Sequence, residues 1–211
     1  MLQSYLKKKD SWPKKVIGLT GIIASGKSTT ARLISQMGIT VLDADELAKD
    51  AVRPGTQALQ RLVNTLGTGI LKQNGDLDRA RVLGLILSDA GIKQTVENII
   101  HPEILKLMDE RLKALKAKGV EMVFVEVPLL FEAGWEGLFD MIVTVSAPEK
   151  ACIKRLIERN NIGRRKAIMW LKQQLPQGEK IRRSDYVIFN DFQENLQKQV
   201  AKLIDDISRT P

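Results

Sequence analysis

A short run of glycine, lysine and serine near the amino end constrains this chain more than any other stretch. Gly21, Gly26, Lys27 and Ser28 match the spacing G-x-x-x-x-G-K-[ST] of a phosphate-binding loop. The apolar residues 16–19 before it predict a buried strand, and from Lys27 onward apolar residues recur at helical spacing. This order of strand, loop and helix suits an anion, because unpaired backbone N–H groups and the helix dipole face the phosphate oxygens.

The motif assigns a task to each polar residue. We expect Lys27 to reach the terminal phosphates of ATP as a catalytic residue and the Ser28 hydroxyl to ligate Mg²⁺. A glycine-containing turn without a ligand is the alternative, and the strand and helix around the motif argue against it. The loop residues expected to bind the nucleotide are Gly21, Ala24, Ser25, Gly26, Lys27, Ser28 and Thr29.

Length and charge bound the classes of function. The chain has 211 residues, which suits one domain or a core with a small insertion, and a formal net charge of +8. That charge agrees with a nucleotide kinase with two polyanionic substrates, with a nucleic-acid-binding protein, or with a surface that is merely basic. The few aromatic residues are not interleaved with the basic clusters, which weakens binding of single-stranded nucleic acid by stacking.

The single cysteine and the first 15 residues indicate in which cellular compartment the protein is expected. The single Cys152 excludes an intrachain disulfide and favours a reducing compartment, and its helical context predicts a packing role. Residues 1–15 carry several lysines but no apolar segment, so we expect a loosely ordered extension that is neither a secretory signal nor a membrane anchor. No run approaches the roughly 18 apolar residues of a transmembrane span. We therefore expect a cytoplasmic protein.

Five apolar runs predict a mostly parallel five-stranded sheet, and a long helical pattern without a strand predicts a substrate-binding lobe. The runs cover about residues 16–19, 39–42, 122–127, 141–145 and 185–189. We expect an α/β fold, a three-layer sandwich of the P-loop NTPase type. Its expected parts are an extension of residues 1–15, then a single kinase domain of residues 16–211 with a core of about 16–45, 119–150 and 181–211, a helical lobe of about 46–118 and a lid of about 151–180.

Three acidic residues fall at or just after the carboxyl ends of two predicted strands, where ligands bind in open α/β sheets. Asp45 lies in the first turn of a helix, while Asp43 suits the cap of that helix. Asp45 is either catalytic or a surface carboxylate that complements the helix dipole. Glu126 lies where an acidic residue holds Mg²⁺ directly or through water. The apolar residues 128–131 after it are either core or a wall for the non-phosphate part of a ligand.

His101 and Pro102 divide the long helical stretch. They predict one helix over residues 92–100 and another that begins at Pro102, because proline is tolerated in a first turn. His101 is the only histidine and has no metal-binding companion, so we expect it to be packed or to cap a helix.

Basic residues gather on one face of a later helix, which begins at Pro148. Arg155 and Arg159 are either part of a solvated face or part of a mobile lid that stabilises the charge of the transferred phosphoryl group. In the second case residues 160–163 would be the hinge.

Together these residues resemble the dephospho-coenzyme A kinase family over nearly all of residues 16–204. Several matching stretches are uncommon in other phosphate-loop kinases, and their order and spacing make the match specific. They are residues 18–21, 26–29, Asp43-Ala44-Asp45, Pro54-Gly55, Leu77-Asp78-Arg79, residues 97–104, Val127-Pro128-Leu129-Leu130-Phe131-Glu132, Lys154-Arg155 with Arg159, Gln174-Leu175-Pro176 and residues 180–190.

The resemblance implies transfer of the ATP γ-phosphoryl group to the ribose 3′-hydroxyl of dephospho-coenzyme A, the last step of coenzyme A synthesis. It makes Asp45 the general base or the residue that orients the hydroxyl. It assigns Arg159 and Arg155 to the lid, and it puts Asn190 near the ATP base. The residues implied for the acceptor are Asp45, Arg79, His101, Glu126, Pro128, Leu129, Leu130 and Phe131.

The sequence departs from the family at a few positions. Ile22 and Ala24 stand where the family usually has glycine, so the loop is expected to be stiffer. Glu126 stands where aspartate is usual, which keeps the charge and lengthens the reach by one methylene. Trp170 stands where arginine is frequent, so a lid contact is expected to be missing. We expect these changes to reduce activity and not to abolish it.

Other functions agree with part of the pattern. The loop fixes the phosphoryl donor and says little about the acceptor, so a kinase for another nucleotide or small metabolite is an alternative. A nucleotide-dependent switch or a nucleic-acid-associated NTPase agrees with the charge, but no Asn-Lys-x-Asp guanine-reading sequence occurs in the chain. We expect ATP and dephospho-coenzyme A as partners, no membrane, and a monomer or small homo-oligomer.

Overall fold

A computed structural model of the chain describes residues 5, 9–191 and 196–209. The described part contains two compact units, one formed by residues 44–114 and the other by the residues before 44 and after 114. The expected extension of residues 1–15 lies partly outside the described residues. Within the described part, no helix is both long and apolar enough to cross a membrane.

Helices and strands follow the expected order, and each strand begins and ends within one residue of its expected range. The elements are η1 (Lys9–Ser11), β1 (Lys15–Thr20), α2 (Lys27–Gln36), β2 (Thr40–Asp43), α3 (Ala44–Ala51), α4 (Gln57–Leu66), η2 (Thr68–Ile70), α5 (Arg79–Ser88), α6 (Ala90–Ala117), β3 (Met122–Glu126), η3 (Glu136–Leu138), β4 (Met141–Ser146), α7 (Glu149–Asn160), α8 (Arg164–Lys172), α9 (Gln177–Arg182), β5 (Tyr186–Phe189) and α10 (Leu196–Arg209).

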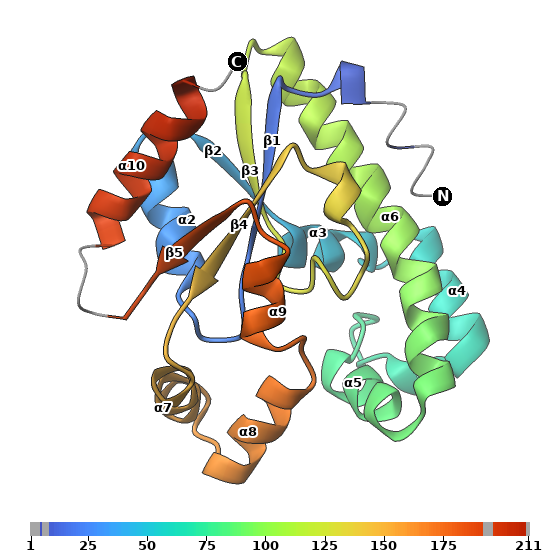
Figure 1. The fold of residues 1–211 in the computed structure, drawn as a ribbon. Helices are drawn as coiled ribbons and strands as arrows, with labels where there is room; N and C mark the ends of the chain where they lie inside the picture. The colour runs from blue at the N-terminus through green and yellow to red at the C-terminus, as the bar shows by residue number, and fades with distance from the viewer. Residues whose placement is uncertain (1–4, 6–8, 192–195, 210–211) are drawn as a thin grey trace. The chain divides into compact units, whose positions relative to one another are not determined.

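The strands form one parallel sheet in the order β2-β3-β1-β4-β5 (Figure 1). β3 lies between β1 and β2, so the register places Glu126 beside Leu19 on one side and beside Asp43 on the other. Because all strands are parallel, their carboxyl ends open on one edge, where the loop after β1 also begins. The expected α/β fold with a five-stranded parallel sheet is confirmed.

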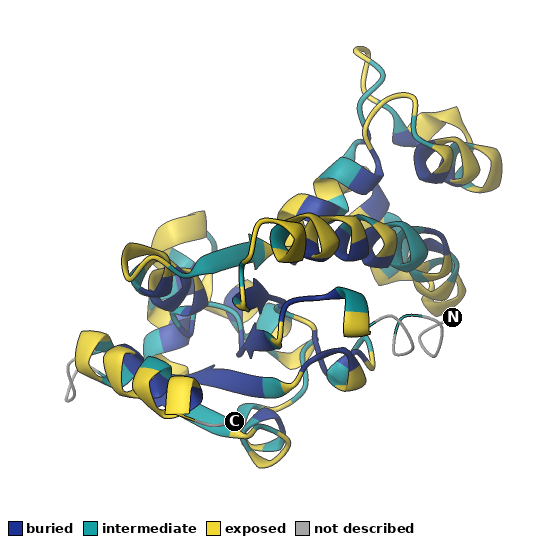
Figure 2. Ribbon diagram, turned by 90° about the horizontal axis from the view of Figure 1, so that it is seen from above, coloured by how far each residue is buried: buried dark blue, intermediate teal, exposed yellow. Residues whose placement is uncertain are grey.

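Helices α2 and α10 cover one face of this sheet. Ile17 and Leu19 of β1 belong to a buried cluster with Ile34 of α2 and Leu203 of α10. Alternate residues of a strand share a face, and residues three or four apart share a helix face, so these apolar spacings meet. Burying one such side chain contributes about 1.5–3 kcal/mol. Figure 2 shows the inner strands β1, β3 and β4 buried and the outer sides of the helices exposed.

The opposite face of β1 is covered by the segment that follows β3. A Cβ on Gly18 would lie 2.6 Å from Leu130 Cδ1 and 3.0 Å from the Phe139 ring. Glycine at this position therefore lets the segment pack directly on the strand. Leu130 and Phe139 are both buried there.

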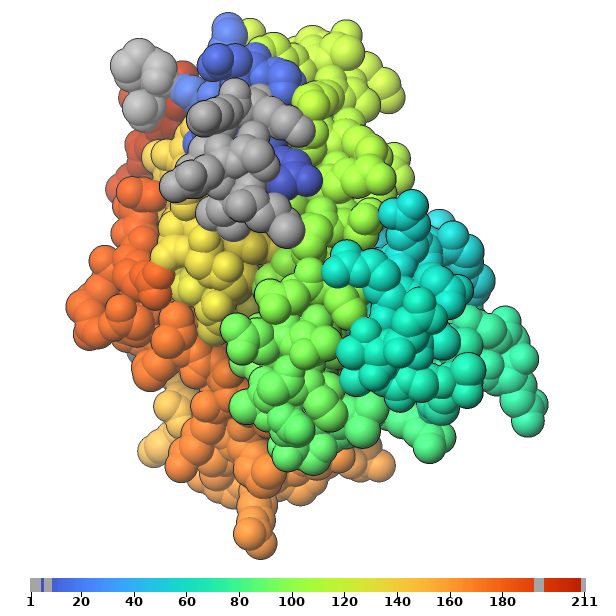
Figure 3. Space-filling model, turned by 90° about the vertical axis from the view of Figure 1, so that its right-hand side faces the viewer, coloured from blue at the N-terminus to red at the C-terminus, as the bar shows by residue number. Residues whose placement is uncertain are grey.

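The unit of residues 44–114 is helical, with one isolated bridge between Leu71 and Leu77. Two of its helices have side-chain N-caps: the Thr56 hydroxyl accepts from Leu59 N, and the Asp78 carboxylate accepts from Arg81 N. Figures 1 and 3 show α4 lying alongside α6. Apolar residues of both helices are buried, among them Leu59, Leu62, Ile104, Leu105, Met108 and Leu112.

The expected helix boundary at Pro102 is wrong, because α6 runs through it as one helix. Proline inside a helix costs about 3 kcal/mol, since it removes a donor and its ring meets the carbonyl four residues earlier. However, Val96 and Ile99 before the proline and Ile104 and Leu105 after it are all buried. At about 1.5–3 kcal/mol for each side chain, this burial outweighs the local cost.

Candidate active site

The loop between β1 and α2 has a backbone that its glycines permit. Gly21 and Gly26 have φ values of +147° and +106°. A Cβ on Gly21 would lie 2.3 Å from the Val145 carbonyl oxygen, and one on Gly26 would lie 2.1 Å from Asn190 Nδ2. Both positions therefore require glycine. Ala24 also has a positive φ, +63°, which costs a non-glycine residue about 1–2 kcal/mol.

Lys27 turns its ammonium back over this loop. The side chain is 7% exposed, and Nζ donates to the carbonyl oxygens of Gly21 at 3.0 Å and Ile22 at 3.1 Å. The Ser25 hydroxyl is buried without a hydrogen-bond partner among the described residues. A loop of backbone amides at a helix N-terminus with one buried ammonium has the donors and the charge that phosphate groups require.

Ser28 and Glu126 lie in contact at the edge of the loop. The Ser28 hydroxyl donates to Glu126 Oε1 at 3.0 Å, and Glu126 is 8% exposed. A hydroxyl and a carboxylate are hard oxygen ligands, which Mg²⁺ accepts together with phosphate oxygens and water. The two residues expected as metal ligands are therefore brought together. The described residues hold no group of three or more His, Cys, Asp or Glu side chains arranged for a metal.

Arg155 and Asn190 hold the loop from the side of β5. Arg155 Nη1 donates to the carbonyl oxygens of Ala24 at 3.1 Å and Ser25 at 3.4 Å, and Asn190 Nδ2 donates to the Ser25 carbonyl oxygen at 2.8 Å. The guanidinium thus fixes the carbonyl of the strained Ala24. Arg155 was expected in the lid and Asn190 near the ATP base, and in the structure both contact the phosphate loop itself.

Arg159 takes a different position from Arg155. It is exposed in the last turn of α7, and its Nε donates to Asn160 Oδ1, the next residue, at 3.0 Å. Thr29 is also exposed, in the first turn of α2. The structure therefore brings Arg155 to the phosphate loop and leaves Arg159 on the surface.

Residues 128–131 divide into surface and core. Leu129 is 46% exposed and Pro128 is partly buried, whereas Leu130 has no exposed surface and packs on Gly18. Phe131 is buried beneath Arg183, whose guanidinium carbon lies 4.7 Å from the ring centroid. In this structure Leu130 and Phe131 are buried and anchor the segment, whereas Pro128 and Leu129 form its accessible part.

Two departures from the family have a packing explanation. Ile22 is buried in a cluster with Ala147 and Cys152, so its side chain packs the loop against α7. Glycine at this position would leave a gap. Cys152 is a packing residue as expected, and burial raises the pKa of its thiol. Trp170 packs against the cluster of Ile153, Leu156 and Ala167, and Lys166 Nζ lies 5.5 Å from its ring centroid.

Asp45 and Arg79 belong to the unit of residues 44–114. Asp45 is exposed in the first turn of α3, directly after the carboxyl end of β2. The next residue, Glu46, has a pKa below its ordinary value, chiefly because Lys49 donates to it, and Arg79 acts in the same direction. Arg79 is thus within electrostatic range of the turn that carries Asp45.

His101 lies in the middle of α6, so the expectation that it caps a helix is wrong and the packed alternative agrees with the structure. Its ring is partly buried. Burial lowers the pKa of His101 below 6.5, while the charge of Glu97, one turn earlier, acts in the opposite direction.

We expect His101 to make the protein less stable in mild acid. The unfolded chain binds the proton more tightly than the folded chain, so stability falls as pH drops below 6.5 and through the lowered pKa of the folded state. In His101→Gln, the difference between the free energies of unfolding at about pH 7.5 and pH 5 should shrink. Urea denaturation at the two pH values measures this, and an unchanged difference would contradict it.

Three residues that received no role from the sequence join the site. Gln174 Oε1 accepts from Ile23 N of the phosphate loop at 2.7 Å. The buried Lys180 and the partly exposed Glu132 form an ion pair beneath residues 128–131. All three lie in stretches that match the family, which is the signal that could have found them.

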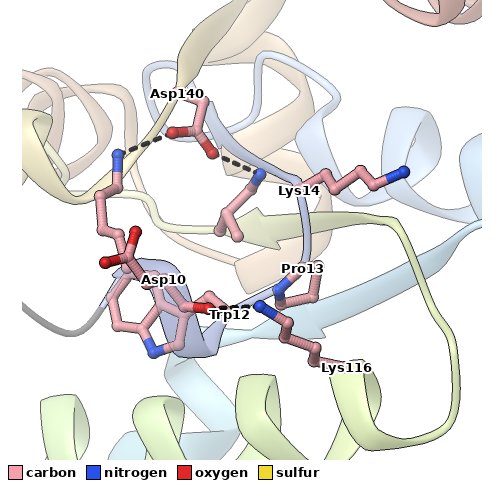
Figure 4. A pocket seen from close by; sticks show the side chains of 8 residues that line it. Asp10, Trp12, Pro13, Lys14, Lys116 and Asp140 are labelled. Atoms are coloured by element: carbon pink, nitrogen blue, oxygen red, sulfur yellow. Dashed lines mark hydrogen bonds and ion pairs between the residues drawn. The ribbon is translucent and has the colours of Figure 1, made fainter.

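A pocket lies at the opposite edge of the sheet from the phosphate loop. It has a volume of about 340 Å³ and is lined by Trp12, Pro13, Lys14, Lys116 and Asp140, among others. Figure 4 shows Asp140 hydrogen-bonded to the backbone of β1, and Lys116 hydrogen-bonded to the Asp10 carbonyl. Lys9 also donates to Asp140. These residues lie at the amino ends of β1 and β4, whereas the phosphate loop follows the carboxyl end of β1, so the pocket is separate from the candidate site.

Known proteins provide an independent comparison. The family model described as Dephospho-CoA kinase matches residues 15–195. A protein of Carboxydothermus hydrogenoformans named Dephospho-CoA kinase is 36% identical over 190 residues, covering 90% of this chain and 92% of that protein. The structure of TT1252 from Thermus thermophilus has a TM-score of 0.81 at 33% identity and covers 94% of this chain and 100% of that one. The structure of dephospho-CoA kinase from Campylobacter jejuni has a TM-score of 0.67 at 25% identity and covers 92% and 97%.

Proposed function

The chain belongs to the dephospho-CoA kinase family and is an ATP-dependent kinase, and from this premise we propose how its residues carry out the transfer. The reaction moves the γ-phosphoryl group of ATP to the 3′-hydroxyl of dephospho-CoA and completes coenzyme A. The family assignment does not favour another acceptor or a nucleic-acid-associated NTPase. The observation that carries the proposal is the phosphate loop with Lys27 inside it and the Ser28–Glu126 pair at its edge.

The donor side consists of the backbone amides of the phosphate loop, the Lys27 ammonium and the Arg155 guanidinium. The amides of residues 24–29 would hold the β- and γ-phosphates, and Lys27 would exchange its loop carbonyls for phosphate oxygens. Arg155 and Asn190 keep the loop in the shape that these contacts need. The unpartnered Ser25 hydroxyl and the strained Ala24 support a loop whose shape serves a ligand, because such costs concentrate at functional sites.

Ser28 and Glu126 are the residues that fit Mg²⁺. Their oxygens already lie 3.0 Å apart, and a phosphate oxygen and water would supply further ligands. The ion, when bound, neutralises charge on the phosphates. Glu126 reaches the Ser28 hydroxyl despite the extra methylene relative to aspartate, so this departure keeps the contact.

For the acceptor we propose apolar contacts and polar contacts, each taken from its own part of the chain. Pro128 and Leu129 offer apolar surface to the non-phosphate part of dephospho-CoA. Asp45 would accept the proton of the 3′-hydroxyl or orient it, with Arg79 and His101 as further acceptor contacts, and Arg159 would stabilise the transferred group when the lid of residues 151–180 closes. Support for Asp45 comes from its place after a strand's carboxyl end, where ligands of open α/β sheets bind.

A direct assay tests the function. Purified protein with Mg-ATP should phosphorylate dephospho-CoA and give coenzyme A, identified by mass spectrometry, while a panel of nucleosides and nucleoside monophosphates stays unmodified. Omission of Mg²⁺ with excess chelator should stop the reaction. Turnover of a panel member with no coenzyme A formed would overturn the assignment. The domain boundaries, a cytoplasmic location and a monomer or small homo-oligomer stay predictions from the sequence.

A further inference from the structure

A fully buried lysine lies beneath the accessible part of the acceptor segment. Lys180 of α9 is 0% exposed, and its Nζ donates to the Pro128 carbonyl oxygen at 2.9 Å and to Glu132 at 3.0 Å. The same Pro128 oxygen accepts from the hydroxyl of Thr20, the last residue of β1, at 3.3 Å. One carbonyl is therefore held both by α9 and by the strand that leads into the phosphate loop.

Glu132 connects this ammonium to a second backbone group. Its Oε1 accepts from Leu175 N at 2.8 Å as well as facing Lys180 Nζ at 2.9 Å. The neighbouring Gln174 accepts from Ile23 N of the phosphate loop at 2.7 Å. Residues 174–180 are thus hydrogen-bonded to the phosphate loop through Gln174 and to residues 128–132 through Leu175 and Lys180.

Stability alone does not account for such a pair. Removing the Lys180 ammonium from water costs several kcal/mol, Glu132 remains partly exposed, and apolar residues often stabilise a fold equally well. Burial lowers the pKa of Lys180, and the ion pair with Glu132 opposes that shift, which agrees with a charged lysine held by its partner. What the pair adds is fixed geometry, because the ammonium must donate to Pro128 and Glu132 at once.

We propose that Lys180 and Glu132 are positioning residues for the acceptor, which hold Pro128 and Leu129 in register with the phosphate loop. This rests on the proposed role of Pro128 and Leu129 in contacting dephospho-CoA. Neither Lys180 nor Glu132 needs to touch a substrate, since both act through the backbone of residues 128–132. Loss of the pair should therefore weaken the binding of dephospho-CoA. The binding of ATP should stay unchanged, because it depends on Lys27, Arg155 and Asn190.

The test compares the Michaelis constants of the two substrates. Lys180→Met keeps the length of the side chain without the ammonium, and the double variant Lys180→Met with Glu132→Leu removes both charges so that no ion is left buried alone. In either folded variant the KM for dephospho-CoA should rise about tenfold, within the range known for misplaced groups, while the KM for ATP changes less than about twofold. Glu132→Gln, at a partly exposed residue, gives the same comparison if Lys180 variants do not fold.

A control and a separate assay make the outcome specific. Lys9→Met breaks the ion pair with Asp140 at the opposite edge of the sheet and should leave both Michaelis constants unchanged. A merely structural role for Lys180 would lower the melting temperature with both constants intact, and this result, or an equal rise in both, would overturn the inference. Failure of the wild-type protein to phosphorylate dephospho-CoA would instead contradict the proposed function.

Discussion

A Lys27→Ala variant should lose ATP binding and turnover together, with kcat/KM for ATP falling about a thousandfold. The ammonium is 7% exposed inside the phosphate loop and bonds to the loop carbonyls of Gly21 and Ile22. Its removal takes away a positive charge from a site where a triphosphate carries several negative charges. Isothermal titration with ATP and steady-state kinetics measure the two effects separately.

The control for this variant is Lys14→Ala, which removes an exposed lysine paired with Glu121 at the opposite edge of the sheet. We expect its kinetics to match those of the wild-type protein, because a surface ion pair contributes little. Circular dichroism and thermal melting establish that Lys27→Ala is folded. A folded Lys27→Ala protein that binds ATP as tightly as the wild type would remove the assignment of this loop as the donor site.

Asp45→Asn should lower kcat by about 10²–10⁴-fold, the usual contribution of a positioned general base, with little change in ATP affinity. The substitution keeps the size of the side chain and removes the negative charge that can accept a proton. The loop that holds ATP involves other residues, so the effect should appear in kcat and not in the binding of ATP.

Asp50→Asn on the same helix is the matched control, because Asp50 pairs with Arg53 and has no proposed role in the transfer. Its kcat should remain close to that of the wild type. An Asp45→Asn enzyme with unaltered kcat would show that the transfer needs no carboxylate at this position, and the search for a base would turn to the other acidic residues of the chain.

Local features could be read from the chain because their causes lie within a few residues. The phosphate loop needs glycine at positions where a Cβ would strike Val145 or Asn190, and glycine followed by lysine and serine is visible in the sequence. The caps at Thr56 and Asp78 are likewise short-range hydrogen bonds. The five strands follow from apolar runs, which is why their ends agree within one residue.

Packing between distant residues decided two points that local sequence rules could not, the helix boundary at Pro102 and the position of Leu130. Pro102 is a sound stop signal, but the buried side chains on both sides of it hold α6 as one helix. For Leu130 the sequence left core packing and a ligand wall open, and in the structure this side chain is buried against Gly18, more than a hundred residues earlier. The sequence could not decide either case, because the deciding atoms are distant along the chain.

The sequence by itself determined the phosphoryl donor, the parallel five-stranded sheet and the family, since each depends on residue types at short spacing. Only the tertiary structure decided the order β2-β3-β1-β4-β5, which sets Glu126 beside the strand of the phosphate loop. It also decided the contacts of Arg155 with Ala24, of Gln174 with Ile23 and of Lys180 with Glu132. The physical reason is that a hydrogen bond or ion pair depends on a few ångströms in space, and these partners are separated by 48 to 151 positions in the chain.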